Sequence, residues 1–271
     1  MSEVDLQREA EGLEQGQGPS WAESWGRDEF GLHAVFRVGG VEQRMRWIPA
    51  GEAWTGSPAE EGGSAYEQPP RLVLLTRGFW LADTPCTQEL WQEVMGENPS
   101  RFVGPRRPVE QVSWEDVQRF CERLEQRVDG LAVGLPSELE WEHACRANTA
   151  RAARYGELDD IAWYDDNAGD QTHDVGLKQP NSWGLYDMLG NVWEWCHDDG
   201  RDYDERRGDE RRGDDRREAE PAVGRGPLRV FRGGGWDSPA DHARAASRSW
   251  DAPDIRDDYL GFRLARGQAL R

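Results

Sequence analysis

The sequence predicts a domain of the α+β class, because its strand and helix signals occupy separate parts of the chain. A β-hairpin pattern comes first, over residues 32–48. Three amphipathic helical patterns follow between residues 87 and 146. Beyond residue 150 the chain is rich in Gly, Asp, Trp and Pro, which is typical of short strands joined by long loops. Segregated strands and helices indicate an α+β rather than an alternating α/β fold.

The first strands are predicted from apolar runs and the turn residues between them. Runs over 32–38 and 41–48 are separated by two glycines, which is the spacing of a tight hairpin turn. Residues 51–70 are rich in Gly, Pro and Glu and are expected to form a loop. A short buried strand is predicted over 71–76, and it continues through 78–82.

Three helices are predicted from their N-terminal capping residues. Thr87 can cap the first helix, and a glycine after its apolar face ends it. Ser113 and Ser137 open the second and third helices, and each is followed three residues later by an acidic residue, the pattern of a capping box. Two further strands are predicted near the end of the chain, over 228–232 and 260–264.

The domain boundaries follow from composition. Residues 1–30 are polar and acidic without hydrophobic periodicity, so we expect a flexible acidic lead-in before a domain over 31–266. Residues 204–217 repeat an Asp-Glu-Arg-Arg-Gly unit and contain no apolar side chain. A segment of this kind cannot contribute to a core, so 198–220 is predicted to be a charged, partly disordered insertion.

Charge and cysteine content exclude several classes of function. The 271 residues carry a formal net charge of −19, which argues against nucleic-acid binding and against docking on anionic membranes. There is no apolar run of membrane-spanning length and no visible secretory signal, so a cytoplasmic location without membrane insertion is expected. The four cysteines form no CxxC pair, so a zinc knuckle is excluded and buried free thiols are expected.

Several motifs, taken in order, resemble the formylglycine-generating enzyme family, also called the sulfatase-modifying factor family. They are WIPAG at 47–51, GFWL at 78–81, TPCT at 84–87, PVEQVSW at 108–114, LPSELEWE at 135–142, NSWGLYDMLGNVWEW at 181–195, RGGGW at 232–236 and LGFR at 260–263. The resemblance implies a C-type-lectin-like fold of the formylglycine-generating-enzyme type. Such a fold has a small twisted antiparallel sheet, flanking helices and much irregular loop.

The resemblance also bears on catalysis. The family's enzymes use a copper-assisted cysteine pair between the motifs that correspond here to residues 232–236 and 260–263. This segment contains no cysteine, and Ala245 stands where one is expected. Because Cu(I) prefers thiolate ligands, no copper is expected and a non-catalytic protein is predicted. An iron-dependent branch is not expected either, since no two histidines are spaced i,i+4. The alternative is formylglycine generation or a related oxidation by a divergent site.

A structural calcium site is also implied by the family. The side chains of Asp187 and Glu194 and the backbone carbonyls of Gly190 and Val192 would supply hard oxygen ligands. The alternative is that the two carboxylates accept hydrogen bonds from backbone amides in the turn. A second calcium site of the family lies in a loop that is shortened here, so this site is not carried over. Side chains in this loop that could still supply oxygens are Asp165, Asp166, Asn167 and Asp170.

Residues 232–264 resemble the variable region of proteins diversified by diversity-generating retroelements. A regular framework alternates with clusters of other residues. Such retroelements change adenines, and changes of this kind in asparagine codons can produce most residues of the clusters. Trp250 cannot be produced in this way. The resemblance implies a variable surface that binds a protein or small-molecule ligand with basic or hydrogen-bond-donating groups. A purely structural module is the other alternative. The predicted ligand-binding residues, here called the display positions, are Trp236, Asp237, Ser238, Asp241, His242, Ser249, Trp250, Asp251, Ile255, Asp257, Asp258 and Tyr259.

Overall fold

The computed structural model describes most of the chain. The described residues are 6, 9, 11–13, 15–61, 63–147, 149, 152–200 and 228–267. The predicted charged insertion, 198–220, lies outside the described residues from position 201 onward. Its predicted start is wrong, because Asp198 and Asp199 are buried residues of a β-strand. Among the residues that are described, no helix is both long and apolar enough to cross a membrane.

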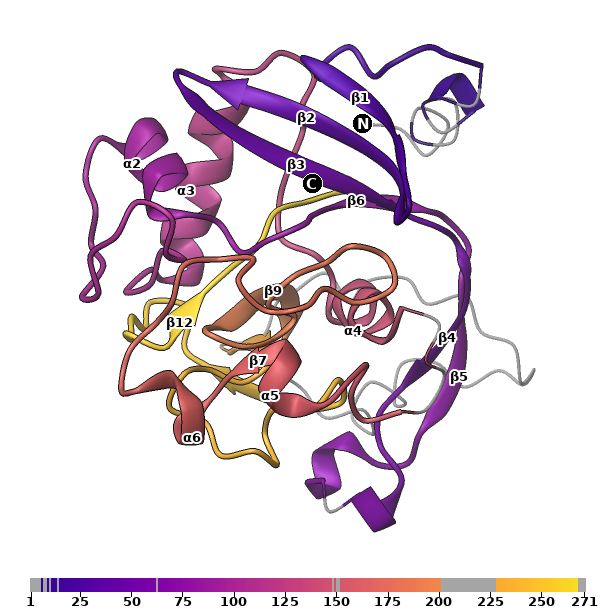
Figure 1. Cartoon of the computed structure of the whole chain (residues 1–271), viewed down its shortest axis with the longest axis vertical. Coiled ribbons are helices and arrows are strands. Elements are labelled where there is room, and N and C mark those ends of the chain that lie inside the picture. The colour runs from indigo at the N-terminus through magenta and orange to yellow at the C-terminus, as the bar shows by residue number, and fades with distance from the viewer. Residues whose placement is uncertain are drawn as a thin grey trace.

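A five-stranded antiparallel sheet forms one side of the molecule, in the order β1-β2-β3-β6-β13 (Figure 1). The predicted hairpin is confirmed, because residues 33–38 of β2 pair with residues 41–46 of β3. Gly39 in its turn has a φ of +57°, a conformation that glycine adopts without strain. The strands are β1 (Ser24–Asp28), β2 (Gly31–Val38), β3 (Val41–Ile48), β6 (Phe79–Ala82) and β13 (Ala265–Arg266).

The prediction of a flexible lead-in over residues 1–30 is wrong where the structure describes this stretch. β1 pairs with β2, and Trp21 is buried with its ring 5.5 Å from that of Trp80 in an edge-to-face contact. Leu6 and Leu13 also belong to the core. These apolar residues are isolated in a polar sequence, so periodicity could not reveal them. Their partners are supplied by the sheet rather than by the local chain.

A second sheet has the order β11-β10-β9-β12 and carries the C-terminal half of the chain. β12 runs parallel to β9, whereas the other pairs are antiparallel. A short parallel pair of β7 and β8 lies outside both sheets. The strands are β7 (Ala162–Trp163), β8 (Leu189–Gly190), β9 (Trp193–Asp199), β10 (Arg229–Arg232), β11 (Arg248–Asp251) and β12 (Leu260–Gly261).

The region between β3 and β6 differs from the prediction. β4 (Gly51–Thr55) occupies the start of the predicted loop and pairs with β5 (Arg71–Leu75) as a long two-stranded ribbon (Figure 1). Two 3₁₀ turns, η1 (Ala59–Glu61) and η2 (Ala65–Glu67), join the two strands. β5 is not the buried strand that was predicted, because Leu72 and Leu74 are exposed. Apolar content alone does not distinguish a buried strand from one half of an exposed ribbon.

The three long helices begin where their capping residues predict. The Thr87 hydroxyl accepts a hydrogen bond from the backbone of α2 (Gln88–Met95), and Gly96 ends this helix in a left-handed conformation. Ser113 and Ser137 form capping boxes at α3 (Trp114–Glu125) and α4 (Glu138–Arg146). Two single-turn helices that the sequence did not predict follow: α5 (Leu158–Ile161) and α6 (Asp165–Ala168). One turn is too short to show hydrophobic periodicity.

Two apolar clusters make up the core. The first lies between the five-stranded sheet and helices α2 and α3, where the rings of Trp91 and Phe120 stack 5.1 Å apart. The second surrounds Trp141 of α4 and includes residues of β6, β9 and β10. Segment 232–264 contributes to both clusters, so its backbone is attached to the core of the domain.

Candidate ligand-binding face

The segment that carries the display positions divides into buried and solvent-facing side chains. Ala243 through Arg248, which belong to the predicted framework, are all buried, with at most 6% of any residue exposed. Asp237, Asp241 and His242 are exposed, and the other display positions except one are half-buried. The segment therefore presents its display positions outward while its framework faces the core.

Ser238 is the exception among the display positions. It is 4% exposed, and its hydroxyl accepts hydrogen bonds from the Gly235 amide at 2.9 Å and from the Trp193 indole nitrogen at 3.0 Å. The prediction that Ser238 lies on a ligand-binding face is therefore wrong. A serine next to glycines is common in exposed loops and in buried turn anchors, so sequence alone could not distinguish the two.

Trp236 is held at one end of the face by fixed contacts. Its ring lies edge-to-face against Phe102 at 5.4 Å, and its indole nitrogen donates to the backbone oxygen of Asp258 at 3.0 Å. The Asp258 carboxylate in turn forms an ion pair with Arg101. Trp236 is thus a half-buried anchor, and the loop that carries Arg101 and Phe102 extends the face beyond the predicted segment.

Carboxylates give this end of the face a negative charge. Partial burial raises the pKa of Asp237, and the neighbouring Asp258 and Asp257 raise it further. Burial also raises the pKa of the Tyr259 hydroxyl to about 12, with Asp257 as the next largest cause. Tyr259 is therefore a neutral hydrogen-bond donor at neutral pH. Neighbouring carboxylates that raise one another's pKa favour a ligand that brings positive charge or N–H donors.

The other end of the face is formed by β11 and the η2 turn. The Trp250 ring meets the Tyr66 ring edge-to-face at 4.9 Å, and Tyr66 is 47% exposed. Asp251, next to Trp250, is close enough to Tyr259 to raise the pKa of its hydroxyl, which links the two ends. Sequence reasoning missed Tyr66, because it lies in a Gly- and Pro-rich stretch with no motif. Only the fold brings it to Trp250.

The turn between the two ends is fixed to the start of α3. The backbone amide of Glu115 donates to the Pro253 oxygen at 3.3 Å, and that of Gln111 donates to the Asp257 oxygen at 2.9 Å. Ile255 is half-buried within this turn. Its backbone amide donates to the Ala252 oxygen at 3.1 Å, closing the turn locally. These bonds use backbone atoms, so they do not depend on which side chains the display positions carry.

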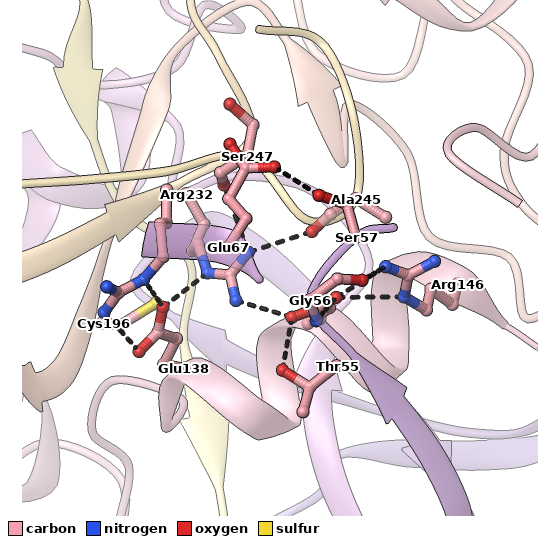
Figure 2. Close-up of polar contacts among 12 residues, drawn as sticks. Thr55, Gly56, Ser57, Glu67, Glu138, Arg146, Cys196, Arg232, Ala245 and Ser247 are labelled. Atoms are coloured by element: carbon pink, nitrogen blue, oxygen red, sulfur yellow. Dashed lines mark hydrogen bonds and ion pairs between the residues drawn. The ribbon is translucent and has the colours of Figure 1, made fainter. Parts of the chain in front are cut away.

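Buried arginines attach the framework to the rest of the domain. Arg244 pairs with Glu67 of η2 at 2.8 and 3.1 Å, and Arg248 pairs with Glu138 of α4 at 2.6 and 3.0 Å. The Arg232 guanidinium also contacts Glu138, at 3.0 Å. Figure 2 shows Arg232 beside Glu138. Buried guanidinium–carboxylate pairs of this kind fix geometry because either partner left alone is a costly buried charge.

Glu142 of α4 is the centre of this network. Its carboxylate accepts hydrogen bonds from the Thr55 hydroxyl at 2.8 Å, from the Gly56 amide at 2.9 Å and from the Arg232 guanidinium at 2.6 Å. Arg146, one helical turn later, donates two more at 3.0 and 2.7 Å. Glu142 therefore joins the end of β4, helix α4 and strand β10 at a point with no solvent exposure.

Hydrogen bonds already involve the side chains at the predicted calcium site. Both Glu194 oxygens accept from the Arg263 guanidinium, at 2.6 and 2.7 Å, and one also accepts from Trp141 at 2.7 Å. Asp187 accepts from the Gly176 amide at 2.7 Å, and burial raises its pKa to about 6. Within the described ranges no group of three or more His, Cys, Asp or Glu residues could hold a metal ion. Calcium at this site stays a prediction, and no function is assigned to a metal here.

The four cysteines are buried free thiols, as predicted. Cys86 and Cys121 lie in the first core cluster, and Cys145 and Cys196 lie in the second. Burial raises the pKa of each thiol, that of Cys145 to about 12. Their thiolate forms are therefore strongly disfavoured. Residues 232–264, here called the display segment, contain no cysteine.

Comparison with known proteins identifies the family. The model of the sulfatase-modifying factor enzyme 1-like domain matches residues 37–268. This match covers most of the chain, so the protein belongs to that family. Its fold is the α+β, C-type-lectin-like fold of the formylglycine-generating-enzyme type, as predicted.

Relatives in the family have diverse descriptions. The chain is 32% identical to the formylglycine-generating enzyme of Streptomyces coelicolor, over 66% of this chain and 59% of that protein. It is 29% identical to the inactive Cα-formylglycine-generating enzyme 2 of Bos taurus, over 70% of this chain and 59% of that protein. The chaperone protein LppX of Paenibacillus barcinonensis is 27% identical over 70% of this chain and 80% of its own length. The chain thus spans less than two thirds of both formylglycine-type relatives.

Two solved structures match nearly their whole length. The variable protein 1 of Treponema denticola superimposes with a TM-score of 0.73 at 31% identity, covering 87% of this chain and 99% of that one. PvdO of Pseudomonas aeruginosa superimposes with a TM-score of 0.74 at 26% identity, covering 86% and 97%. The fold is therefore shared with PvdO and with a protein described as variable.

Proposed function

We propose that this protein is a non-catalytic ligand-binding protein that displays a variable surface on a C-type-lectin-like scaffold. The observation that supports this most strongly is the burial pattern of residues 232–264. The framework stretches 232–235, 243–248 and 260–264 are buried, whereas the display positions, apart from Ser238, are half-buried or exposed. A scaffold of this kind allows side chains to change on the surface at little cost to folding. The likeness to the Treponema denticola variable protein supports the same proposal.

The chemistry of the face supports a partner with positive charge or hydrogen-bond donors. Trp236, Trp250 and Tyr259 supply large, stiff aromatic surfaces, which dominate the energetics of adaptable binding sites. Carboxylates at Asp237 and Asp257 surround the tyrosine and add polarity. We further propose that the face is the target of a diversity-generating retroelement.

The experiment that tests diversification is to sequence the DNA that flanks the gene. A reverse-transcriptase gene, together with a second copy of the region encoding 232–264 that differs only at adenines, is the expected result. If neither is present, diversification is refuted, and a binding face of fixed specificity or a structural module remains.

The enzymatic alternative has its own test. A cysteine-containing sulfatase peptide is incubated with the protein and copper under air, and the product is analysed by mass spectrometry. No conversion of the cysteine is expected, because the display segment lacks the cysteine pair and the four thiols of the chain are buried. Formation of formylglycine would overturn the non-catalytic proposal. An active formylglycine-generating enzyme assayed in parallel shows that the conditions support turnover.

A further inference from the structure

A groove at the junction of α2, α3 and the display segment gathers three arginines in a strongly acidic protein. The groove has a volume of about 500 Å³ and lies where α2 and α3 pack side by side (Figure 1). Its arginines are Arg119 and Arg123 of α3 and Arg256 of the display segment. The chain carries a net charge of −19, so three guanidinium groups around one groove run against the overall charge.

The acidic side chains of the groove neutralise only part of this charge. Asp116 forms ion pairs with both Arg119 and Arg256, the latter with contacts of 2.7 and 3.0 Å. Glu97 is the other carboxylate that lines the groove. Arg123 makes its contact with a backbone oxygen, that of Met95, at 3.3 Å. Among the side chains that line the groove, guanidinium groups outnumber carboxylates by three to two, and Asp254 and Glu115 lie near Arg256.

The arginines retain donors for a ligand. Arg119 is about half exposed and gives one nitrogen to the capping aspartate, while Arg123 gives one to a backbone oxygen. Within the described part of the chain, the structure assigns no other partner to either guanidinium. The planar guanidinium fork matches a carboxylate with two parallel hydrogen bonds. Trp91, Met95 and Pro99 provide apolar walls beside these donors.

We propose that this groove binds the carboxylate groups of a small acidic ligand, either a free polycarboxylate or the acidic side chains of a peptide. A volume of about 500 Å³ is within the range of small-ligand sites. Gln111 lines the groove and is bonded through its backbone to Asp257, so the site adjoins the display face. Arg119 and Arg123 lie on a helix outside the display segment, so the site does not depend on diversification.

The test is calorimetric titration of the full-length protein at low ionic strength and neutral pH. The probes are citrate, tri-glutamate and inorganic phosphate. Arg123→Gln and Arg256→Gln each remove one guanidinium of the groove. Arg127→Gln is the matched control, because Arg127 is an exposed arginine that pairs with Glu93 and does not line the groove. Far-UV circular dichroism checks that each variant is folded.

The proposal predicts saturable binding of citrate or tri-glutamate to the unmodified protein. Each groove variant is expected to weaken binding by about fivefold or more, and the control to change it by less than about twofold. Tighter binding of citrate indicates a free polycarboxylate, and tighter binding of tri-glutamate indicates a peptide ligand. Absence of saturable binding would overturn the proposal, as would equal weakening by Arg127→Gln. Tighter binding of phosphate than of either carboxylate probe would overturn the assigned ligand class.

Discussion

Replacement of Glu142 by Gln tests whether the framework is held by its buried charge network. The Glu142 carboxylate accepts hydrogen bonds from Arg232 and Arg146, and all three residues are buried. Glutamine keeps the shape of the side chain but removes the charge, so Arg146 loses this carboxylate and Arg232 is left with Glu138. Removing one partner of a buried ion pair costs about 3–5 kcal/mol of unfolding free energy.

The predicted loss is large relative to the stability of a domain of this size. A loss of about 3–5 kcal/mol corresponds to a fall in Tm of roughly 6–20 °C, since each kcal/mol shifts Tm by about 2–4 °C at this chain length. Thermal unfolding followed by circular dichroism measures the shift directly, and urea unfolding gives the free energy. Asp237→Asn is the matched control, because it also neutralises one acid but on the exposed face. Its expected effect is within about 0.5 kcal/mol.

Two results would refute this reasoning. The first is a loss below about 1 kcal/mol in Glu142→Gln, which is the range of an ordinary exposed pair. The second is an equal loss in Asp237→Asn, which would place the display face within the same energetic network as the framework. If Glu142→Gln does not fold at all, Glu67→Gln provides the intermediate case. Glu67 compensates a single framework arginine, Arg244.

Three further predictions concern titration, thiols and metal. Burial raises the pKa of Glu110 to about 7 from an ordinary 4.5. Between these pH values the folded protein keeps a proton on Glu110 that the unfolded chain loses. The free energy of unfolding therefore falls as pH rises from 4.5 to 7. Glu110→Gln retains an acceptor for the Phe102 amide and should flatten the dependence of Tm on pH from 4.5 to 7; an unchanged slope would contradict the assignment. The four buried thiols should react with a thiol reagent only after denaturation, and a fast-reacting thiol in the native protein would reopen the oxidoreductase alternative. Because Glu194 is paired with Arg263, calcium and chelator should leave Tm unchanged, whereas a clear rise in Tm with calcium would restore the predicted metal site.

The parts of the fold that the sequence predicts correctly are those with local signals. The turn at Gly39 and the caps at Ser113 and Ser137 act over a few residues, so their positions can be identified without tertiary context. β1 and β4 were missed because their pairing depends on strands that lie elsewhere in the chain. Their own residues show neither a regular alternation nor a continuous apolar run.

The site was predictable only in part, for the same physical reason. The alternation of framework and display positions corresponds to burial, but Ser238 is turned inward by two hydrogen bonds that no local pattern shows. Arg248 and its partner Glu138 are separated by 110 residues in sequence. Tyr66 reaches Trp250 only because η2 folds against β11. Contacts between distant segments therefore define both the support of the face and its outer edge.

The most direct test of the central claim compares two libraries of this protein. In one, the outward display positions between 236 and 259 are randomised; in the other, an equal number of buried framework positions in 232–264 are randomised. The fraction of folded variants is measured by protease resistance on a display system, followed by sequencing. The account predicts that most variants of the first library fold and that few of the second do. Equal folded fractions would contradict the claim that this segment is a variable surface on a fixed framework.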